Sequence, residues 1–166
     1  MRTSILVVGA IVVVAALGLL AYYYFSQGHV DIYISDPPSP QRIAIYVTFT
    51  SIALHRVNAN GTGGWIVLFN GSRTVELTST PQLLLSASVP AGEYNEVFFT
   101  ISEATVQIDG SNITARIPSG VFKVHIIGGM RLNGGSSEKL LISFPHVVFH
   151  DGELIISPSI TAQVVS

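Results

Sequence analysis

The sequence contains no cysteine, and this absence removes several kinds of site at once. Without a thiol the 166-residue chain can form no disulfide scaffold, no thiolate zinc or iron-sulfur site and no cysteine nucleophile. Charged residues are also scarce, because Asp, Glu, Lys and Arg make up 11% of the chain against about 25% in an ordinary soluble domain. Such a composition is unlike that of an ordinary cytosolic protein.

The chain also lacks the features of a nucleic-acid-binding protein and of an enzyme. It has 8 Lys and Arg against 10 Asp and Glu, whereas a phosphate backbone requires clustered positive charge. There is no G-x-S-x-G elbow, no G-x-G-x-x-G and no P-loop. The carboxylates of Glu93, Glu96, Glu103, Asp109 and Asp151 are interpreted as solvated or turn-forming groups. We therefore expect no nucleic-acid partner, no enzymatic activity and no cofactor.

Residues 5–25 form the longest apolar run of the chain, within an uncharged segment from Thr3 to Val30. At 1.5 Å per residue this run makes a helix of about 31 Å, which matches the ~30 Å hydrocarbon core of a bilayer. A cleaved signal is the alternative, but its apolar run is usually about 7 to 15 residues long and ends at a small-x-small site. The run here ends instead in aromatic residues typical of a membrane interface, which are Tyr22, Tyr23, Tyr24 and Phe25. The pattern favours an uncleaved single-pass anchor.

The flanking residues predict the orientation of this helix. Arg2 and the amino terminus carry the positive charge, so we expect the amino end in the cytoplasm and the rest of the chain outside. Three Asn-x-Ser/Thr sequons agree with export and are candidate N-glycosylation sites: Asn60, Asn70 and Asn112. We expect two parts, an anchor over residues 1–28 and an extracytoplasmic domain over residues 29–166, at the cell membrane.

After the helix, apolar and polar residues alternate with a period of two between turn-forming residues, which indicates an all-β domain. In residues 43–54 the apolar phase shifts, and this predicts a β-bulge near Ser51. The pattern predicts an antiparallel β-sandwich, Ig-like or transthyretin-like, with one helical interruption at residues 80–86 whose leucines cap the core. The expected strands and turns are 30–34, 43–54, 65–69, 73–77, 94–101, 105–108, 113–117, 121–132 with a bend at Gly128-Gly129, 139–144 and 154–164, with turns at Asp36-Pro37-Pro38, Asn60-Gly61, Asn70-Gly71, Asp109-Gly110, Pro118-Ser119-Gly120, Asn133-Gly134-Gly135 and Asp151-Gly152.

These segments resemble a known family. VDIYISDPPS, IAIYVTFTSIALHRV, GGWIVLF, TVELTST, VPAGEY, IPSG and LIISPSI occur in an order similar to that of the prokaryotic domain-of-unknown-function family 4382, over residues 30–160. The resemblance implies an exported, anchored β-sandwich with no assigned activity. The matching positions are Asp36 and Pro37, His55, Trp65, residues 83–85, 90–94 and 118–120, and Pro158; Asp-Pro-Pro replaces the family's usual Asp-Ala-Pro.

Two aromatic residues have specific expected roles. Tyr94 follows Pro90-Ala91-Gly92, a turn from which its hydroxyl can reach back to the backbone, as in the corners of β-sandwiches. Trp65 alternates with Val67 and Phe69, so we expect it to be buried, with ligand stacking as the alternative.

The histidines are His29, His55, His125, His146 and His150. In an extended chain His146 and His150 lie about 13 Å apart, too far to share one ion. We therefore expect no metal site, with one built across strands from His125, His146 or His150 as the alternative.

Together these features predict a membrane-anchored, extracytoplasmic β protein of the cell envelope with a non-catalytic binding or structural role. The expected partners are the bilayer and other envelope or membrane proteins, because only residues 26–29 separate the helix from the first strand. An accessory single-span subunit of a membrane complex, a subunit of a surface filament and an exported enzyme are the alternatives.

Overall fold

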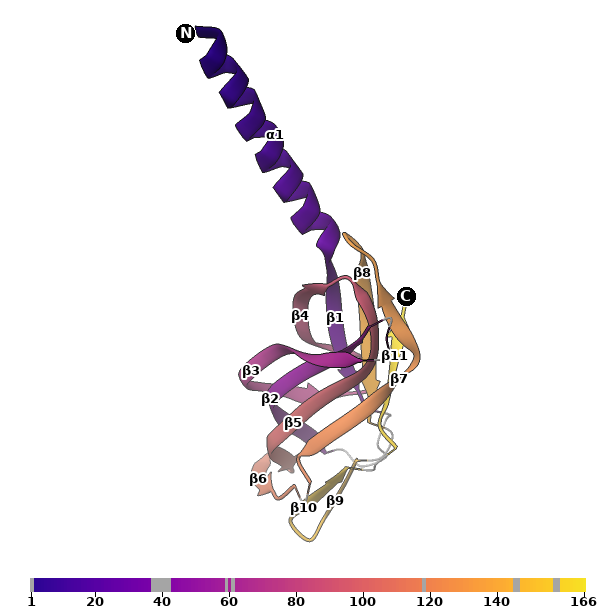
Figure 1. The fold of residues 1–166 in the computed structure, drawn as a ribbon. Coiled ribbons are helices and arrows are strands. Elements are labelled where there is room, and N and C mark those ends of the chain that lie inside the picture. The colour runs from indigo at the N-terminus through magenta and orange to yellow at the C-terminus, as the bar shows by residue number, and fades with distance from the viewer. Residues whose placement is uncertain are drawn as a thin grey trace.

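The computed structural model describes residues 2–36, 43–58, 60, 62–117, 119–144, 147–156 and 159–166, with side chains from residue 7 onward. It begins with helix α1 (Arg2–Ser26), which passes directly into strand β1 (Gln27–Ser35). By length and composition, Val7–Ser26 can cross a membrane, and none of it is buried inside the protein. The predicted apolar helix is thus confirmed, and Figure 1 shows it projecting from the β domain.

The rest of the described chain is built from strands, which confirms the prediction of a mainly β domain. After β1 they are β2 (Ala44–Val57), β3 (Gly63–Leu77), β4 (Gln82–Pro90), β5 (Gly92–Ile108), β6 (Ser111–Ala115), β7 (Val121–Leu132), β8 (Ser137–Ser143), β9 (Val147–His150), β10 (Glu153–Ile156) and β11 (Thr161–Val165).

Eight strands form one continuous sheet in the order β3-β2-β5-β7-β11-β8-β1-β4, while β6 pairs with β5 and β9 with β10. Cα atoms of the two end strands, β3 and β4, approach within 8 Å, so the sheet curls into a nearly closed barrel (Figure 1). Two pairings are parallel, β1 with β8 and β7 with β11. The prediction of a sandwich with antiparallel pairing throughout is therefore wrong in the direction of these two pairings. Alternation of apolar and polar residues shows which side of a strand is apolar, but it does not show which strand pairs with it.

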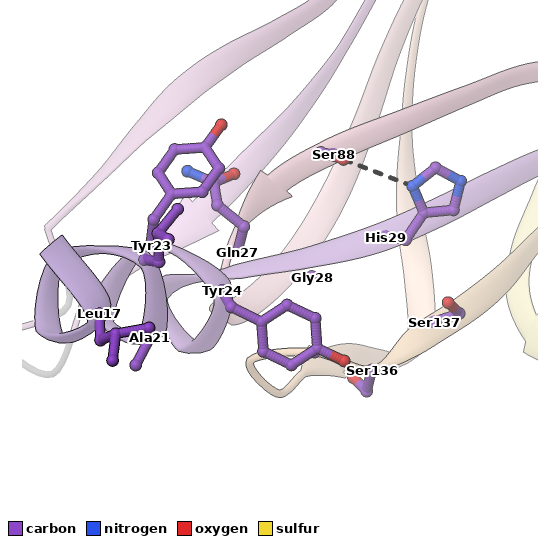
Figure 2. Close-up of a pocket in the computed structure, with 12 residues that line it drawn as sticks. Leu17, Ala21, Tyr23, Tyr24, Gln27, Gly28, His29, Ser88, Ser136 and Ser137 are labelled. Carbon is purple, nitrogen blue, oxygen red and sulfur yellow. Dashed lines mark hydrogen bonds between the residues drawn. The ribbon is translucent and has the colours of Figure 1, made fainter. Parts of the chain in front are cut away.

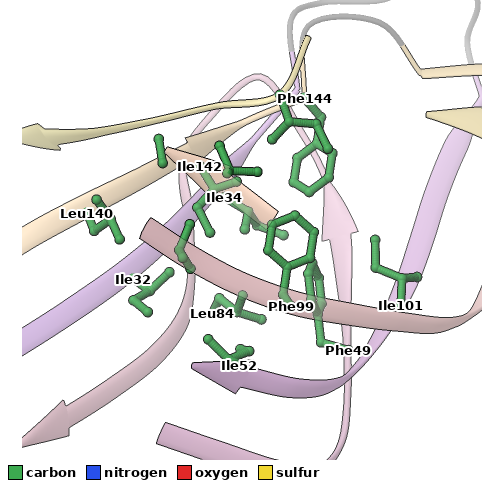
Figure 3. Close-up of a cluster of buried hydrophobic side chains, with 14 of the residues drawn as sticks. Ile32, Ile34, Phe49, Ile52, Leu84, Phe99, Ile101, Leu140, Ile142 and Phe144 are labelled. Atoms are coloured by element: carbon green, nitrogen blue, oxygen red, sulfur yellow. The ribbon is translucent and has the colours of Figure 1, made fainter. Parts of the chain in front are cut away.

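The barrel interior holds the hydrophobic core. Phe99 lies at its centre, with ring centroids 5.7 Å from Phe49, 5.8 Å from Phe144 and 5.1 Å from Phe122. Figure 3 shows the rings of Phe49, Phe99 and Phe144 surrounded by aliphatic side chains from several strands. The aliphatic residues with no exposed surface include Ile32, Ile34, Ile52, Leu84, Leu140 and Ile142. Strands distant in sequence are thus held together by one core.

Several predicted local features are confirmed. Asp109-Gly110 and Asp151-Gly152 have positive φ angles at both residues, as two-residue hairpin turns require. β7 has the predicted bounds and bends at Gly128 and Gly129, whose φ angles are +75° and +70°. The ladders of β2 with both neighbours shift between Phe49 and Ser51, which is the predicted bulge.

Other boundaries were predicted wrongly. Residues 80–86 do not form a helical turn, because β4 pairs with β1 from Gln82 to Pro90 and supplies hydrogen-bond partners for the backbone of the β1 edge. Asn70-Gly71 is not a turn but an irregularity within the continuous strand β3. The predicted strands 94–101 and 105–108 form the single strand β5, and the last predicted strand is divided into β10 and β11. Pro37, Pro38, Gly61, Pro118, His146 and Pro158 lie outside the described residues.

Candidate functional site

The carboxyl end of α1 is joined to the β domain by backbone hydrogen bonds. The N–H of Ala91 donates to the carbonyl of Ser26, and the N–H of Gly135 donates to the carbonyl of Gln27, each with an N···O distance of 2.8 Å. Ala91 lies between β4 and β5, and Gly135 lies between β7 and β8. Two separate loops therefore hold the junction between helix and domain.

Close packing at the β7–β8 turn reinforces this junction. A Cβ atom on Gly134 would clash with the carbonyl oxygen of Phe25, and one on Gly135 would lie 2.8 Å from the Tyr24 ring. Gly135 also has a φ angle of +74°, which other residues rarely adopt. The turn therefore requires glycine both for space and for backbone conformation.

A groove of about 690 Å³ lies where α1 meets the domain. Figure 2 shows this junction groove, with the helix on one side and strand residues on the other. The helix contributes mainly apolar and aromatic side chains, and the domain contributes polar ones. The lining residues are Leu17, Leu20, Ala21, Tyr23, Tyr24, Gln27, Gly28, His29, Ser88, Gly135, Ser136 and Ser137.

His29 is the polar centre of the domain side of the groove. Its Nδ1 lies 3.5 Å from the Ser88 hydroxyl, and its Nε2 lies 3.4 Å from an Asp31 carboxylate oxygen. The groove thus has one apolar side and one side able to form hydrogen bonds.

Tyr94 forms the predicted corner beside this junction. It is 1% exposed, and its hydroxyl donates to the Pro90 carbonyl at 2.5 Å. The Arg56 guanidinium donates to the neighbouring Ala91 carbonyl at 2.7 Å. Burial raises the pKa of Tyr94 and the nearby Arg56 charge opposes that rise, so the hydroxyl remains a donor at neutral pH.

A second surface feature lies on the outer face of strands β3, β2, β5 and β7, and we call it the aromatic face. The register places Trp65, His55, Glu96 and His125 in one row and Val67, Ala53, Phe98 and Lys123 in the next. Trp65 is 43% exposed, so the expectation that it is buried is wrong. Residues 65–69 are apolar on both sides of the strand, so their alternation did not show which side faces the core. Ile66 is the residue opposite the buried Leu54, and Trp65 therefore lies on the outer side.

The polar residues of the aromatic face interact with one another. Glu96, whose side chain is 12% exposed, lies 3.2 Å from Lys123 and 3.4 Å from His125. His55 Nδ1 is 2.8 Å from the Asn95 side-chain oxygen. The Lys123 ammonium lies over the Trp65 ring, 5.4 Å from its centroid. This surface therefore combines an exposed ring with paired charges.

The structure places the other predicted site residues on the surface. Tyr22, Tyr23, Tyr24 and Phe25 are 62–76% exposed at the end of α1. The sequon residues Asn60, Asn70 and Asn112 are all exposed, and their glycosylation stays a prediction. His150 pairs with Asp151, far along the chain from the partners of His125, and no group of three metal-ligating side chains occurs among the described residues.

Sequence reasoning missed the junction groove. His29 and Ser88 lie 59 positions apart, and no motif connects them. The Asn133-Gly134-Gly135 turn was predicted, but its contact with the helix was not. An unusual signal was present in the two successive glycines, of which only one is needed for the turn conformation.

The arrangement defines a class of protein: a mainly β domain with an amino-terminal apolar helix that acts as a signal sequence or as an anchor. The chain belongs to the family described as "Domain of unknown function (DUF4382)", whose model matches residues 27–158. This match confirms the resemblance, and it begins at the first residue of β1. No curated protein matches the chain.

One solved structure is similar over much of the chain. It is described as "a putative cell adhesion protein" from Bacteroides ovatus, with 12% sequence identity and a TM-score of 0.24. The similarity covers 85% of this chain and 46% of the other, so the chain spans less than half of that protein's length.

Proposed function

We propose that this protein is a non-catalytic binding protein of the cell envelope, held on the outer surface of the membrane by α1 as an uncleaved anchor. The observation that carries this proposal is the junction itself. Tyr24, Phe25 and Ser26 are packed against the domain or hydrogen-bonded to it, so cleavage after the apolar run would remove native contacts. A signal peptide is expected to end in an accessible, small-residue segment instead.

In this arrangement the junction groove lies at the membrane surface. With Val7–Ser26 spanning the bilayer, Leu17 and Leu20 lie at the depth of the lipid chains. His29, Ser88 and the serines of the β7–β8 turn lie at the level of the headgroups. The aromatic residues Tyr22–Phe25 occupy the interface between these levels, where amphipathic rings are favoured. Bilayer and domain are therefore in direct contact.

The absence of cysteine allows a clean test of topology. We would introduce single cysteines, Ser4→Cys near the amino end and Ser111→Cys at the exposed start of β6, and label intact cells with a membrane-impermeant maleimide. Ser111→Cys should react on intact cells, and Ser4→Cys only after permeabilisation. After removal of any N-glycans, the purified parent chain should keep a mass of 17.7 kDa. A mass lower by that of the α1 segment would show that the helix is cleaved off and would contradict the proposed anchor.

The partners are addressed by purification from native membranes in mild detergent. We expect envelope or membrane proteins to copurify without a fixed stoichiometry, as for an independently anchored binding protein. A fixed stoichiometry with one membrane complex would favour the accessory-subunit alternative, in which α1 packs against other helices. Long polymers would favour the filament alternative, in which an edge strand is completed by a neighbour.

A further inference from the structure

We propose that the aromatic face binds neutral polysaccharide, with Trp65 as the ring on which a sugar stacks and Glu96 as the principal hydrogen-bond acceptor. The inference rests on the proposed function, because an envelope glycan can reach this face only if the domain lies outside the membrane. Its evidence is independent of the junction. Figure 1 shows β3, β2, β5 and β7 side by side, forming one broad face of the domain.

Trp65 is exposed enough to bind and constrained enough to bind without a large loss of entropy. The ring is 43% exposed, yet its centroid lies 5.0 Å from the His55 ring and 5.9 Å from the Phe98 ring. Between these rings the register places Ala53, which is 3% exposed although it belongs to the outer face. The rings thus cover the small side chain of Ala53. Because they already pack against one another, Trp65 loses little further conformational freedom when a ligand binds.

Groups that recognise hydroxyls surround this ring. Glu96 supplies carboxylate acceptors, Lys123 and His125 supply donors, and Asn95 supplies an amide. A sugar ring matches this combination, because its C–H surface packs on an aromatic face while its hydroxyls both donate and accept. Lys123 lies over the Trp65 ring and forms an ion pair with Glu96. Movement of its flexible side chain would open the ring to a ligand.

The charge of the aromatic face selects among ligands. Glu96 and Lys123 form a pair of opposite charges, so together they add no net charge to the face. An acidic polymer or nucleic acid would require excess positive charge, which the face lacks. A protein interface centre is usually depleted of charged residues, whereas here an ion pair lies in the middle of the face. A neutral, hydroxyl-rich ligand fits these properties best.

The test uses Trp65 itself, which is the single tryptophan of the chain. The full-length protein in detergent micelles would be titrated with soluble neutral polysaccharides, namely β-1,3-glucan, mannan and galactan, and with hyaluronan as an acidic counterpart. Binding of at least one neutral polysaccharide should shift the tryptophan emission and reduce its quenching by iodide. The emission reports this face alone. No change with any neutral polysaccharide, or a preference for hyaluronan, would overturn the proposal.

Variants connect the binding to these residues. In affinity electrophoresis on a gel containing the bound polysaccharide, Trp65→Ala should weaken binding about tenfold or more, and Trp65→Phe should retain part of it. Glu96→Gln should weaken it severalfold without removing the ring. Val148→Ala, at a residue that is 52% exposed on β9, is the matched surface control and should bind normally. Equal binding by Trp65→Ala and the parent chain would overturn the assignment.

Failure of this proposal is distinguishable from failure of the proposed function. The polysaccharide assays use purified protein and do not depend on topology, whereas the cysteine-labelling experiment does not depend on a ligand. One combination of results would show that the aromatic face is a protein-docking surface. In it the topology is as proposed, none of the neutral polysaccharides binds, and a photo-crosslinker at position 65 captures a membrane protein in stoichiometric amount. That result would overturn the glycan inference and leave the membrane anchor intact.

Discussion

At the scale of single residues, Tyr94 connects the corner of the fold to the junction between α1 and the domain. Its hydroxyl donates to the Pro90 carbonyl, and the next residue, Ala91, both accepts from Arg56 and donates to Ser26. The turn that Tyr94 stabilises is therefore the same turn that holds the end of α1. A local sequence pattern, Pro-Ala-Gly-x-Tyr, predicted the corner because the donor and acceptor are four residues apart.

Tyr94→Phe removes this hydrogen bond while preserving the ring. We expect a loss of about 1 kcal/mol in the free energy of unfolding, the usual net contribution of one hydrogen bond. Urea unfolding followed by circular dichroism measures the change. Tyr46→Phe, at a partly exposed residue, is the control and should alter the free energy by less than about 0.5 kcal/mol. An equal effect of the two variants would contradict the role of the corner.

The same residue predicts how stability depends on alkaline pH. Because burial raises the pKa of Tyr94 above its ordinary value of about 10, the native state keeps this proton when the unfolded chain has lost it. Its contribution is complete below pH 10 and is lost as pH rises through the native-state pKa. Unfolding free energies measured from pH 8 to 11 should fall less steeply in Tyr94→Phe than in the parent protein. Parallel curves would show that Tyr94 does not titrate as described.

At the scale of elements, local chemistry predicted turns better than it predicted strand ends. The Asp-Gly hairpins and the β7 bend follow from residues that adopt positive φ angles, which is a local property. β4 was predicted as a helical turn because Pro81 and three leucines are compatible with one. It is a strand because β1, whose paired residues lie 48 to 63 positions away in the chain, needs a hydrogen-bonding partner for the backbone of its edge.

Leu83 and Leu84 distinguish the two structures of this segment. As part of β4, Leu84 is fully buried whereas Leu83 is 42% exposed. Leu84→Ala should therefore reduce the free energy of unfolding by about 2–5 kcal/mol. Leu83→Ala is its matched control and should cost less than about 1 kcal/mol. Thermal and urea unfolding measure both, and similar losses would contradict the orientation of β4.

The contact between α1 and the β7–β8 turn can be tested at Gly134. Gly134→Ala places a methyl group against the Phe25 backbone, which should destabilise the junction by about 1–3 kcal/mol. Limited proteolysis in detergent should then cut faster near residue 27. Gly64→Ala, where a Cβ meets nothing within 4 Å, is the control and should leave the rate unchanged. Equal cleavage rates of both variants would indicate that the helix is not docked.

At the scale of the whole molecule, β11 completes the barrel. It pairs antiparallel with β8 over five positions and parallel with β7 over two, and so connects the two halves of the sheet. Its Ala162 is fully buried between them. A short strand at the end of the described chain therefore determines whether the sheet is continuous.

Deletion of residues 161–166 should open the barrel between β7 and β8. Two unpaired strand edges and part of the core would then be exposed, which favours aggregation. We expect loss of cooperative thermal unfolding and elution as large species in size-exclusion chromatography. Deletion of Ser166 alone, which lies beyond β11, is the control and should behave as the full chain. A monomeric, cooperatively folded deletion variant would contradict this role of β11.

The sequence by itself determined the apolar helix, the β class of the domain, the bulge in β2, the hairpin turns and the Tyr94 corner. Each of these depends on residues close together in the chain, whose spacing and backbone preferences are visible in the sequence. Only the tertiary structure decided the parallel pairing of β1 with β8, the near closure of the barrel, the outward position of Trp65 and the docking of α1. These depend on contacts between distant segments: alternation marks the apolar side of a strand but does not encode its neighbour, and where both sides are apolar it does not show which side faces the core.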